Sequence, residues 1–224
     1  MKRILCLAFF TLLSVADILA AQPTKSISLF NGKDLHQWMA WTKADGRTSH
    51  PETVFEVSEG MIRLHGKNNG GYLMTKKSYD NFHLSLDYRW NINPLFVPQK
   101  EKRNSGVMFR VDRHAPDSWF PRGIQYQIKT GTTGDFILIK GVTMNIGDKC
   151  YGPGESVLVA RMKDATRPTG EWNHLEIIAH NRHITFILNG VTVNEGTNCS
   201  ATKGRILLCY ETSPIDFKNL ILIK

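Results

Sequence analysis

Apolar and polar residues alternate with a period of two along much of the chain. The clearest stretch is FHLSLDYRW at residues 82–90, where the even positions are apolar or aromatic and the odd positions are polar. This alternation is typical of a β-strand with one buried face. Shorter runs of the same kind, rich in β-branched and aromatic residues, occur at residues 104–110, 123–129, 174–180, 183–190 and 205–210, and at the carboxyl terminus.

Turn signals separate these runs, and no stretch has a convincing helical period. Asn189-Gly190 between two apolar runs is a strong hairpin signal. Many short strands joined by turns predict an all-β sandwich or barrel. Residues 91–103 are expected to be a loop insertion, and residues 131–170 are expected to be long loops around one or two strands. No domain boundary or internal repeat is evident, so we predict a single domain over residues 22–224.

Residues 1–21 are predicted to be a secretory signal peptide. Lys2 and Arg3 precede an apolar run at residues 4–13, and the small residues Ala20 and Ala21 follow it. The run is too short to span a bilayer stably, and no second run of spanning length follows. We therefore expect an exported protein, either periplasmic or extracellular, without a transmembrane segment.

Charge distribution and cysteine content bear on nucleic-acid binding, disulfides and zinc sites. The formal net charge is +8, but the positive residues are scattered, which does not predict nucleic-acid binding. Beyond the signal peptide the chain has three cysteines, Cys150, Cys199 and Cys209. An odd count in an oxidising compartment allows one disulfide and a leftover thiol. No pair of cysteines has the spacing of a structural zinc site.

Several predicted strands also have a face with polar residues. On a period of two, Asn104 and Arg110 share one face of their strand, and Gln125 and Gln127 share one face of the next. If the apolar faces pack together, these polar faces point outward, and one of them can be concave. Amide, guanidinium and carboxylate groups there can hydrogen-bond sugar hydroxyls. The alternative is an ordinary solvated surface.

The order of several short motifs resembles one protein family. These are LFNGKDLHQW at residues 29–38, YRW at 88–90, NSGV followed by Arg110, and G-x-x-x-Q-I at 123–128. GEWNHLEIIAHNRHITFILNG and GRILLCYETSPIDFKNLILIK complete the set, which covers about residues 27–224. The chain resembles the 3-keto-disaccharide hydrolase domain family of exported bacterial proteins. The resemblance implies a concanavalin A-like jelly-roll sandwich of two antiparallel sheets, a carbohydrate partner, and cleavage of glycosides oxidised to a ketone at carbon 3.

The implied reaction starts with removal of the proton on carbon 2, which the ketone makes acidic. The enolate then expels the group on carbon 1, and water adds back. Such a site needs a base, an acid for the leaving group and a positive or donor group for the enolate oxygen. A divalent metal is possible in the last role; the sequence assigns no metal ligands.

Two positions depart from the family pattern. The family has G-aromatic-Glu-x-Gln where this chain has Gln125 in the acidic position, and a Gln where this chain has Cys209. Glutamine cannot exchange a proton near neutral pH. Either other groups carry catalysis, or this member is a non-catalytic glycan-binding module. Converting Gln125 to Glu is expected to add or raise activity in the second case. A structural envelope protein without a sugar site is a third reading.

The sequence thus nominates two sets of site residues. The candidate catalytic residues are Asp87, Arg110, His114 and Glu211. The candidate substrate-binding residues are Arg89, Asn104, Trp119, Gln125 and Gln127. Replacing Arg110 by Ala is expected to abolish turnover without changing thermal melting. The Glu-x-Asp-x-x-Glu spacing of ordinary laminarinase-like glycosidases is absent from the sequence, which disfavours a retaining two-carboxylate mechanism.

Overall fold

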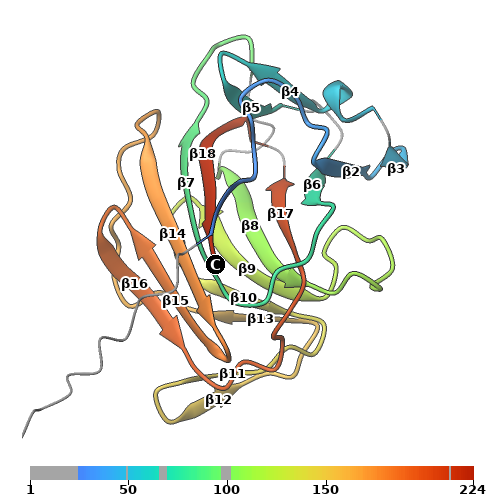
Figure 1. Cartoon of the computed structure of the whole chain (residues 1–224). Coiled ribbons are helices and arrows are strands. Elements are labelled where there is room, and N and C mark those ends of the chain that lie inside the picture. The colour runs from blue at the N-terminus through green and yellow to red at the C-terminus, as the bar shows by residue number, and fades with distance from the viewer. Residues whose placement is uncertain (1–24, 49, 66–69, 97–101, 212) are drawn as a thin grey trace, which may run out of the picture.

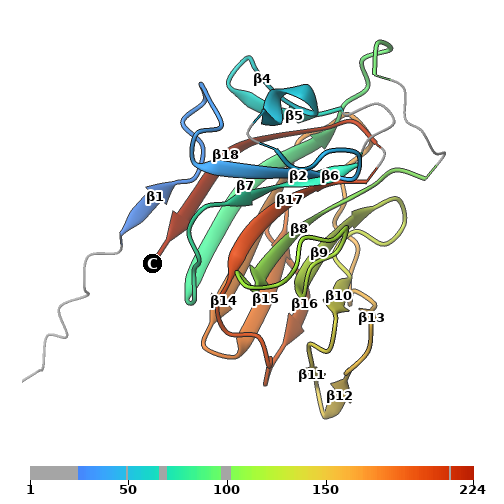
Figure 2. The same ribbon diagram turned by 90° about the vertical axis from the view of Figure 1, so that its right-hand side faces the viewer.

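Two large antiparallel sheets face one another in the computed structural model, which describes residues 25–48, 50–65, 70–96, 102–211 and 213–224 (Figure 1). Figure 2 shows the sheet that contains β6, β17 and β8 in front of the sheet that contains β7 and β14. The predicted all-β sandwich is confirmed. In the described part of the chain, the single helical element is the short 3-10 turn η1 (Pro51–Thr53), and no helix is long and apolar enough to cross a membrane.

The first sheet, here called sheet A, has eight strands. Along the sheet the order is β16-β15-β14-β7-β18-β5-β4, and β1 also pairs with β18. Its strands are β1 (Ser26–Ser28), β4 (Phe55–Ser58), β5 (Met61–Leu64), β7 (Phe82–Trp90), β14 (Asn173–His180), β15 (His183–Leu188), β16 (Val191–Gly196) and β18 (Ile215–Ile223).

The second sheet, sheet B, also has eight strands, in the order β13-β10-β9-β8-β17-β6-β2-β3. Its strands are β2 (Trp38–Thr42), β3 (Gly46–Thr48), β6 (Gly71–Thr75), β8 (Asn104–Val111), β9 (Gly123–Lys129), β10 (Phe136–Ile139), β13 (Ser156–Val159) and β17 (Arg205–Tyr210). A separate hairpin consists of β11 (Met144–Ile146) and β12 (Lys149–Tyr151).

The apolar faces of the strands form the core between the sheets. Strand β7 alternates between buried even positions and half-buried odd positions, as the sequence predicts. The predicted hairpin is also present, because β15 and β16 are joined at Asn189 and Gly190, both with positive φ. The region 131–170 differs from the expectation of one or two strands: it contains four, β10 to β13, because β10 pairs with both β9 and β13, and β11 and β12 pair with each other in a hairpin.

Sheet B is also apolar on part of its outer face, the face turned away from sheet A. A second cluster of buried residues lies there, separate from the core between the sheets. Its buried members are Tyr72, Met74, Met108, Val111, Ile137, Ile139, Leu207 and Cys209, with Met39, Trp41 and Phe120 packed against them. Part of the outer face of sheet B is therefore apolar and buried, whereas we predicted either a polar binding face or plain solvated surface there.

The three described cysteines are all free thiols. Cys150 is exposed, whereas Cys199 and Cys209 are buried. The disulfide that the odd cysteine count allowed is thus not formed among them. Residues 1–24, which include the predicted signal peptide, lie outside the described residues.

Candidate functional site

Four polar side chains meet on the outer face of sheet B. Gln125 and Gln127 come from β9, Asn104 begins β8, and Glu211 directly follows β17. The Gln125 amide nitrogen donates to Gln127 Oε1 at 2.7 Å and to Glu211 Oε1 at 3.3 Å. Asn104 Nδ2 donates to Glu211 Oε2 at 2.5 Å. We call these four residues the amide–carboxylate cluster, and the sequence predicted each of them as a site residue.

Strand pairing brings the cluster together. The register places Gly106 opposite Gln127 and Met108 opposite Gln125, and it places Cys209 opposite Gly106 on the other side. A Cβ atom at Gly106 would lie 2.5 Å from the Gln125 amide nitrogen. The glycine therefore leaves room for the Gln125 side chain to lie across β8 toward Glu211, which no local pattern could reveal.

The cluster borders a cavity of about 330 Å³. Gln125, Gln127 and Glu211 line it, together with Phe120 and a second carboxylate, Glu155, in the loop before β13. The remaining lining residues are Ile137, Ile139, Ser156 and Leu158. Sequence reasoning missed Glu155 and Phe120, because both lie in loops without periodicity. A cavity with apolar walls and a few convergent polar groups is typical of a small-molecule site.

Two oxygens of the cluster lack a hydrogen-bond partner. Asn104 Oδ1 and Gln125 Oε1 are both buried and unpaired in the described part of the chain. A buried polar atom without a partner costs about 1–3 kcal/mol. Hydroxyl groups of a bound sugar would supply the missing donors.

Cys209 lies in the apolar floor beneath the cluster. Burial, and then the charge of Glu211, raise the pKa of the Cys209 thiol well above its usual range. The thiol therefore stays protonated near neutral pH and acts as a small apolar side chain rather than as a nucleophile.

An aromatic group stands on the same face, on the other side of β17. Trp41 of β2 stacks on Tyr72 of β6, with ring centroids 5.4 Å apart, and Trp119 contacts Trp41 edge to face. A Cβ at Gly70 would lie 2.0 Å from the Trp119 ring, so Trp119 packs directly on the backbone there. The structure thus places the predicted sugar-platform residue Trp119 on the same sheet face as the amide–carboxylate cluster.

The loop 112–122, which contains Trp119, is bound to sheet B through Asp117. Its carboxylate accepts hydrogen bonds from Arg47 Nε and Nη2, at 3.0 and 2.9 Å, and from the Tyr72 hydroxyl at 3.1 Å. The Arg47 guanidinium holds the pKa of Asp117 below its usual range. Burial, and then the Asp117 charge, raise the pKa of Tyr72, which remains a neutral hydrogen-bond donor.

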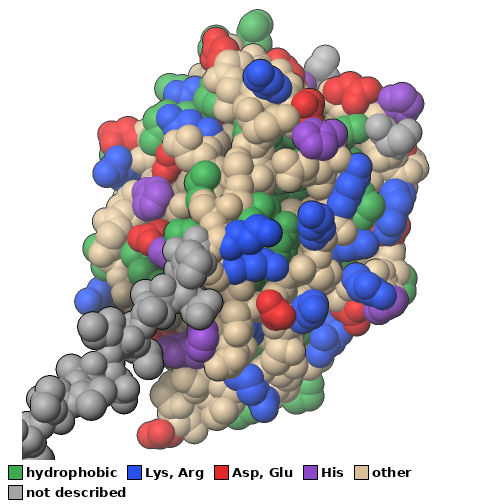
Figure 3. All heavy atoms as spheres, in the orientation of Figure 1, with side chains coloured by type: hydrophobic (Ala, Val, Ile, Leu, Met, Phe, Trp, Pro, Cys, Tyr) green, Lys and Arg blue, Asp and Glu red, His purple; other side chains and the backbone are tan. Residues whose placement is uncertain are grey.

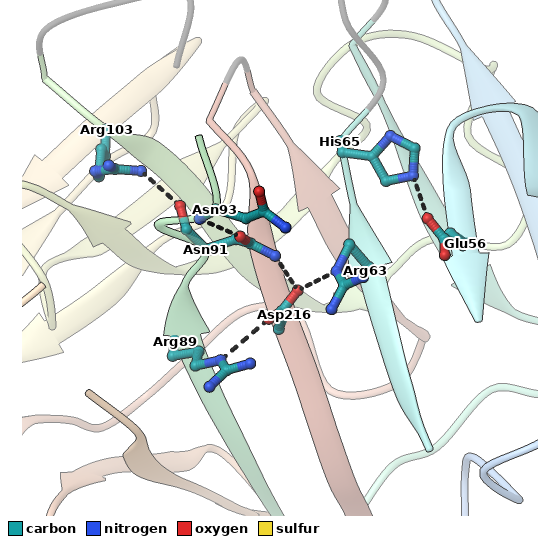
Figure 4. Close-up of polar contacts among 8 residues, drawn as sticks. All are labelled: Glu56, Arg63, His65, Arg89, Asn91, Asn93, Arg103 and Asp216. Carbon is teal, nitrogen blue, oxygen red and sulfur yellow. Dashed lines mark hydrogen bonds and ion pairs between the residues drawn. The ribbon is translucent and has the colours of Figure 1, made fainter. Parts of the chain in front are cut away.

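Asp87 and Arg89 do not join this site, contrary to the prediction of one shared polar face. Both lie on β7 in sheet A. Asp87 accepts hydrogen bonds from His174 Nδ1 at 2.7 Å and Asn219 Nδ2 at 2.6 Å. Figure 4 shows Arg89 directed at the buried Asp216, to which it donates at 3.1 Å. The alternation gave the correct polar face of β7 but could not tell which sheet that strand joins.

Asp216 has further hydrogen-bond donors besides Arg89. Its carboxylate also accepts from Arg63 at 3.0 Å and from Asn91 at 3.0 Å, and Figure 4 shows these groups converging on it. Trp172 packs against Arg89, whose guanidinium lies 4.6 Å from the ring centroid. The Arg89 guanidinium is therefore engaged with its own sheet.

Arg110 is also absent from the predicted face. It has a positive φ of 51°, and the pairing of β8 with β17 is irregular at this point, as in a β-bulge. The extra residue breaks the period of two, and the Arg110 side chain is fully buried. It donates to the backbone carbonyls of Ala201, Asp80 and Asn181 at 2.8, 3.3 and 2.7 Å.

His114 lies in the loop 112–122, and its side chain is exposed. Its Nε2 atom accepts a hydrogen bond from Arg113 Nε at 2.8 Å. It lines a different cavity of about 350 Å³, shared with Arg113 and Lys203. The structure therefore does not bring His114 to the cavity beside Glu211.

No group of three or more His, Cys, Asp or Glu side chains in the described ranges could hold a metal ion. The amide–carboxylate cluster contains one carboxylate, with amide oxygens beside it. The described residues therefore offer no set of metal ligands at this cluster.

Comparison with known proteins gives one family and a set of similar folds. The family model for the 3-keto-alpha-glucoside-1,2-lyase-like domain matches residues 25–223. No match was found among curated proteins. A crystal structure from Parabacteroides distasonis, of a protein named provisionally as a glycosyl hydrolase, is 19% identical with a TM-score of 0.61. That alignment covers 88% of this chain and 92% of the other.

Two further structures show the same fold at lower identity. The Bacillus licheniformis beta-glucanase is 10% identical with a TM-score of 0.53, covering 90% of this chain and 97% of that one. The carbohydrate binding module CBM66 of Bacillus subtilis is 13% identical with a TM-score of 0.50, covering 71% and 84%. The predicted concanavalin A-like jelly roll is thereby confirmed.

Proposed function

Because the chain belongs to the 3-keto-alpha-glucoside-1,2-lyase-like domain family, and is thus a carbohydrate-active protein, we propose that it cleaves glycosides already oxidised to a ketone at carbon 3. The observation that carries the proposal is the buried Glu211 carboxylate, held by the Asn104 and Gln125 amides beside a 330 Å³ cavity. A base fixed beside a cavity suits proton removal from a bound sugar.

Glu211 is proposed as the base. It takes the proton from carbon 2, and the electron pair of that C–H bond moves to the ketone oxygen to form an enolate. When the ketone re-forms, a double bond joins carbons 1 and 2 and the bond from carbon 1 to the leaving oxygen breaks. The leaving oxygen receives a proton, which Glu211 or the neighbouring Glu155 carboxyl can deliver. Water then adds across the new double bond.

The amides position the substrate and stabilise charge in this scheme. The Gln127 NH₂ group makes no hydrogen bond to the described residues, so it is available to donate to the enolate oxygen. The unpaired oxygens of Asn104 and Gln125 accept from sugar hydroxyls. Gln125 itself cannot act as an acid or base, which leaves the proton transfer to the carboxylates.

The test is cleavage of a 3-keto-glucoside, measured by release of its alcohol, with the unoxidised glucoside as the control substrate. We expect cleavage of the keto form alone, because only the ketone acidifies the proton on carbon 2. Glu211→Gln keeps the side-chain shape and is expected to lower the rate by about 10² to 10⁴-fold. Full activity in that variant would contradict the assignment of Glu211.

A glycan-binding module is the second candidate, and the amide at Gln125 is the observation that favours it. In that case sugars raise the melting temperature of the protein, but neither the wild type nor Glu211→Gln releases an alcohol.

We also propose export to the periplasm or the cell exterior, supported by the signal-peptide pattern of residues 1–21. Fractionation of producing cells, with sequencing of the mature amino terminus, tests this: protein retained in the cytoplasm with residues 1–21 uncleaved would contradict export.

A further inference from the structure

A group of arginines lies beside the aromatic residues on the outer face of sheet B. Arg47 is on β3, Arg205 begins β17, and Arg113 is in the loop 112–122. We call these three residues the arginine cluster. Figure 3 shows positive side chains gathered on the right-hand part of the face in view, around β2, β6 and β17.

Asp117 is the carboxylate that acts on Arg205, and its oxygens are already engaged. Both Asp117 oxygens accept hydrogen bonds from Arg47, and one of them also accepts from Tyr72. Arg47 and Arg113 lie close enough to Arg205 for their charges to lower its pKa further, after the larger effect of burial. The cluster thus has more positive than negative charge at short range.

Arg205 is the member of the cluster that donates to no oxygen acceptor among the described residues. Its Nε atom is buried and has no hydrogen-bond partner in the described part of the chain. Its Nη1 atom contacts the thioether of Met74 at 3.8 Å, a weak acceptor. A half-buried guanidinium without a carboxylate or carbonyl acceptor costs free energy that an anionic ligand would recover.

The register fixes where the cluster lies relative to Glu211. Gln127 is opposite Gly106, Gly106 opposite Cys209, Cys209 opposite Tyr72, and Tyr72 opposite Trp41. Three strand-to-strand steps lead from β9 to β6, about 14 Å at the usual spacing between strands, and reach the aromatic residues. Arg205 lies six residues before Glu211 along β17, which is about 20 Å at the usual rise per residue. An oligosaccharide of several sugar rings can therefore reach from the Glu211 cavity past the aromatic residues to the arginine cluster.

We propose that the arginine cluster is a subsite for an anionic group, a carboxylate or a sulfate, on the part of the glycoside that extends beyond the Glu211 cavity. Guanidinium groups bind planar and tetrahedral oxyanions through paired hydrogen bonds. The substrate class is thus an acidic glycoside. This inference rests on the proposed function, because it places the cleaved sugar beside Glu211.

Binding to the purified protein tests the subsite without requiring turnover. The probes are an oligosaccharide of several sugar rings ending in a uronic acid, its sulfated counterpart and its neutral counterpart, each titrated by calorimetry. We expect at least one acidic probe to bind about tenfold or more tightly than the neutral one, the change that 1.4 kcal/mol makes to a binding constant. The preference for the uronate or the sulfate identifies the source of the charge.

Arg205→Gln is expected to remove this preference while leaving affinity for the neutral oligosaccharide unchanged. Lys218→Gln is the control, because it removes one positive charge from a residue of sheet A, stacked on Trp172. Equal binding of acidic and neutral probes, or a preference that survives in Arg205→Gln, would overturn the subsite.

Failure of this inference can be told apart from failure of the proposed function. If a neutral 3-keto-glucoside is cleaved but acidic probes bind no more tightly than neutral ones, the subsite is wrong and the proposed enzyme activity is supported. If acidic probes bind through Arg205 but no keto-glycoside is cleaved, the subsite is supported and the protein is a glycan-binding module instead of an enzyme. Glu211→Gln is expected to lose cleavage and keep the preference for acidic probes.

Discussion

Gln125 is at the centre of the amide–carboxylate cluster, and its neighbours define what it can do. Both protons of its amide are directed at acceptors, Gln127 Oε1 and Glu211 Oε1. It therefore orients the Glu211 carboxylate and leaves its side-chain oxygen, Oε1, for a ligand. Where the resembled family has an acid, this chain has an amide that positions a different acid, Glu211, at the end of a strand two places along the sheet.

Arg110 shows how a single residue can be misplaced by a correct periodic pattern. Its guanidinium links three backbone segments through the carbonyls of Asp80, Asn181 and Ala201. Arg110→Ala would leave these buried acceptors unsatisfied and open a cavity. We expect a loss of about 3 kcal/mol or more in the free energy of unfolding, measured by chemical denaturation, instead of the normal melting that the sequence suggested.

Arg182→Ala is a matched control for this variant. Arg182 also donates to backbone carbonyls, those of Cys199 and Asn198, but it is exposed. Its removal should cost about 1 kcal/mol or less. Normal stability together with lost turnover in Arg110→Ala would instead return Arg110 to the list of catalytic residues.

At the scale of elements, the loop 112–122 decides what the outer face of sheet B can bind. Asp117 ties it to β3 and β6, Trp119 packs on Gly70, and Phe120 lines the cavity beside Glu211. The loop therefore shapes both the proposed catalytic cavity and the aromatic group. Its position depends on an ion pair that is partly exposed to solvent.

The ion pair makes the loop sensitive to acid. Arg47 lowers the pKa of Asp117 in the folded state. The pair therefore stabilises the fold fully at pH values above the pKa that Asp117 has in the unfolded chain. This contribution is lost as the pH falls through the pKa that Asp117 has in the folded protein. Asp117→Asn should therefore lower the free energy of unfolding by about 0.5–1 kcal/mol at pH 7. The difference from wild type should disappear below the folded pKa of Asp117. Denaturation at several pH values measures it, and a difference that persists in acid would rule out the charge as its cause.

At the scale of the whole molecule, the two sheets separate two polar surfaces. The amide–carboxylate cluster and the arginine cluster belong to sheet B, whereas Asp87, Arg89 and Asp216 belong to sheet A. Packed sheets lie about 10 Å apart with the core between them. Side chains on the outer surfaces of both sheets therefore cannot contact the same small substrate.

This separation predicts that Asp87→Asn leaves the cleavage rate of a 3-keto-glucoside unchanged. The variant weakens the bonds to His174 and Asn219, so a loss of about 1 kcal/mol in the free energy of unfolding is expected. Kinetics and denaturation on one preparation separate the two effects. A rate that falls as far as that of Glu211→Gln would place Asp87 in the reaction after all.

The sequence alone determined many of the strands and the polar face of several of them. Strands 82–90 and 123–129 have the predicted bounds, and Asn189-Gly190 makes the predicted turn. It also identified Asn104, Gln125, Gln127 and Glu211 as site residues that the structure brings together. Local alternation suffices for this because side-chain direction follows from the backbone period of two.

Only the tertiary structure decided which polar faces meet. Asp87 and Gln125 have similar patterns, but non-local pairing puts β7 in one sheet and β9 in the other. The bulge at Arg110 and the approach of Glu155 and Phe120 to the cavity also depend on contacts between distant segments. A period of two carries no information about strand order, bulges or loop paths, because these are set by packing between residues far apart in the chain.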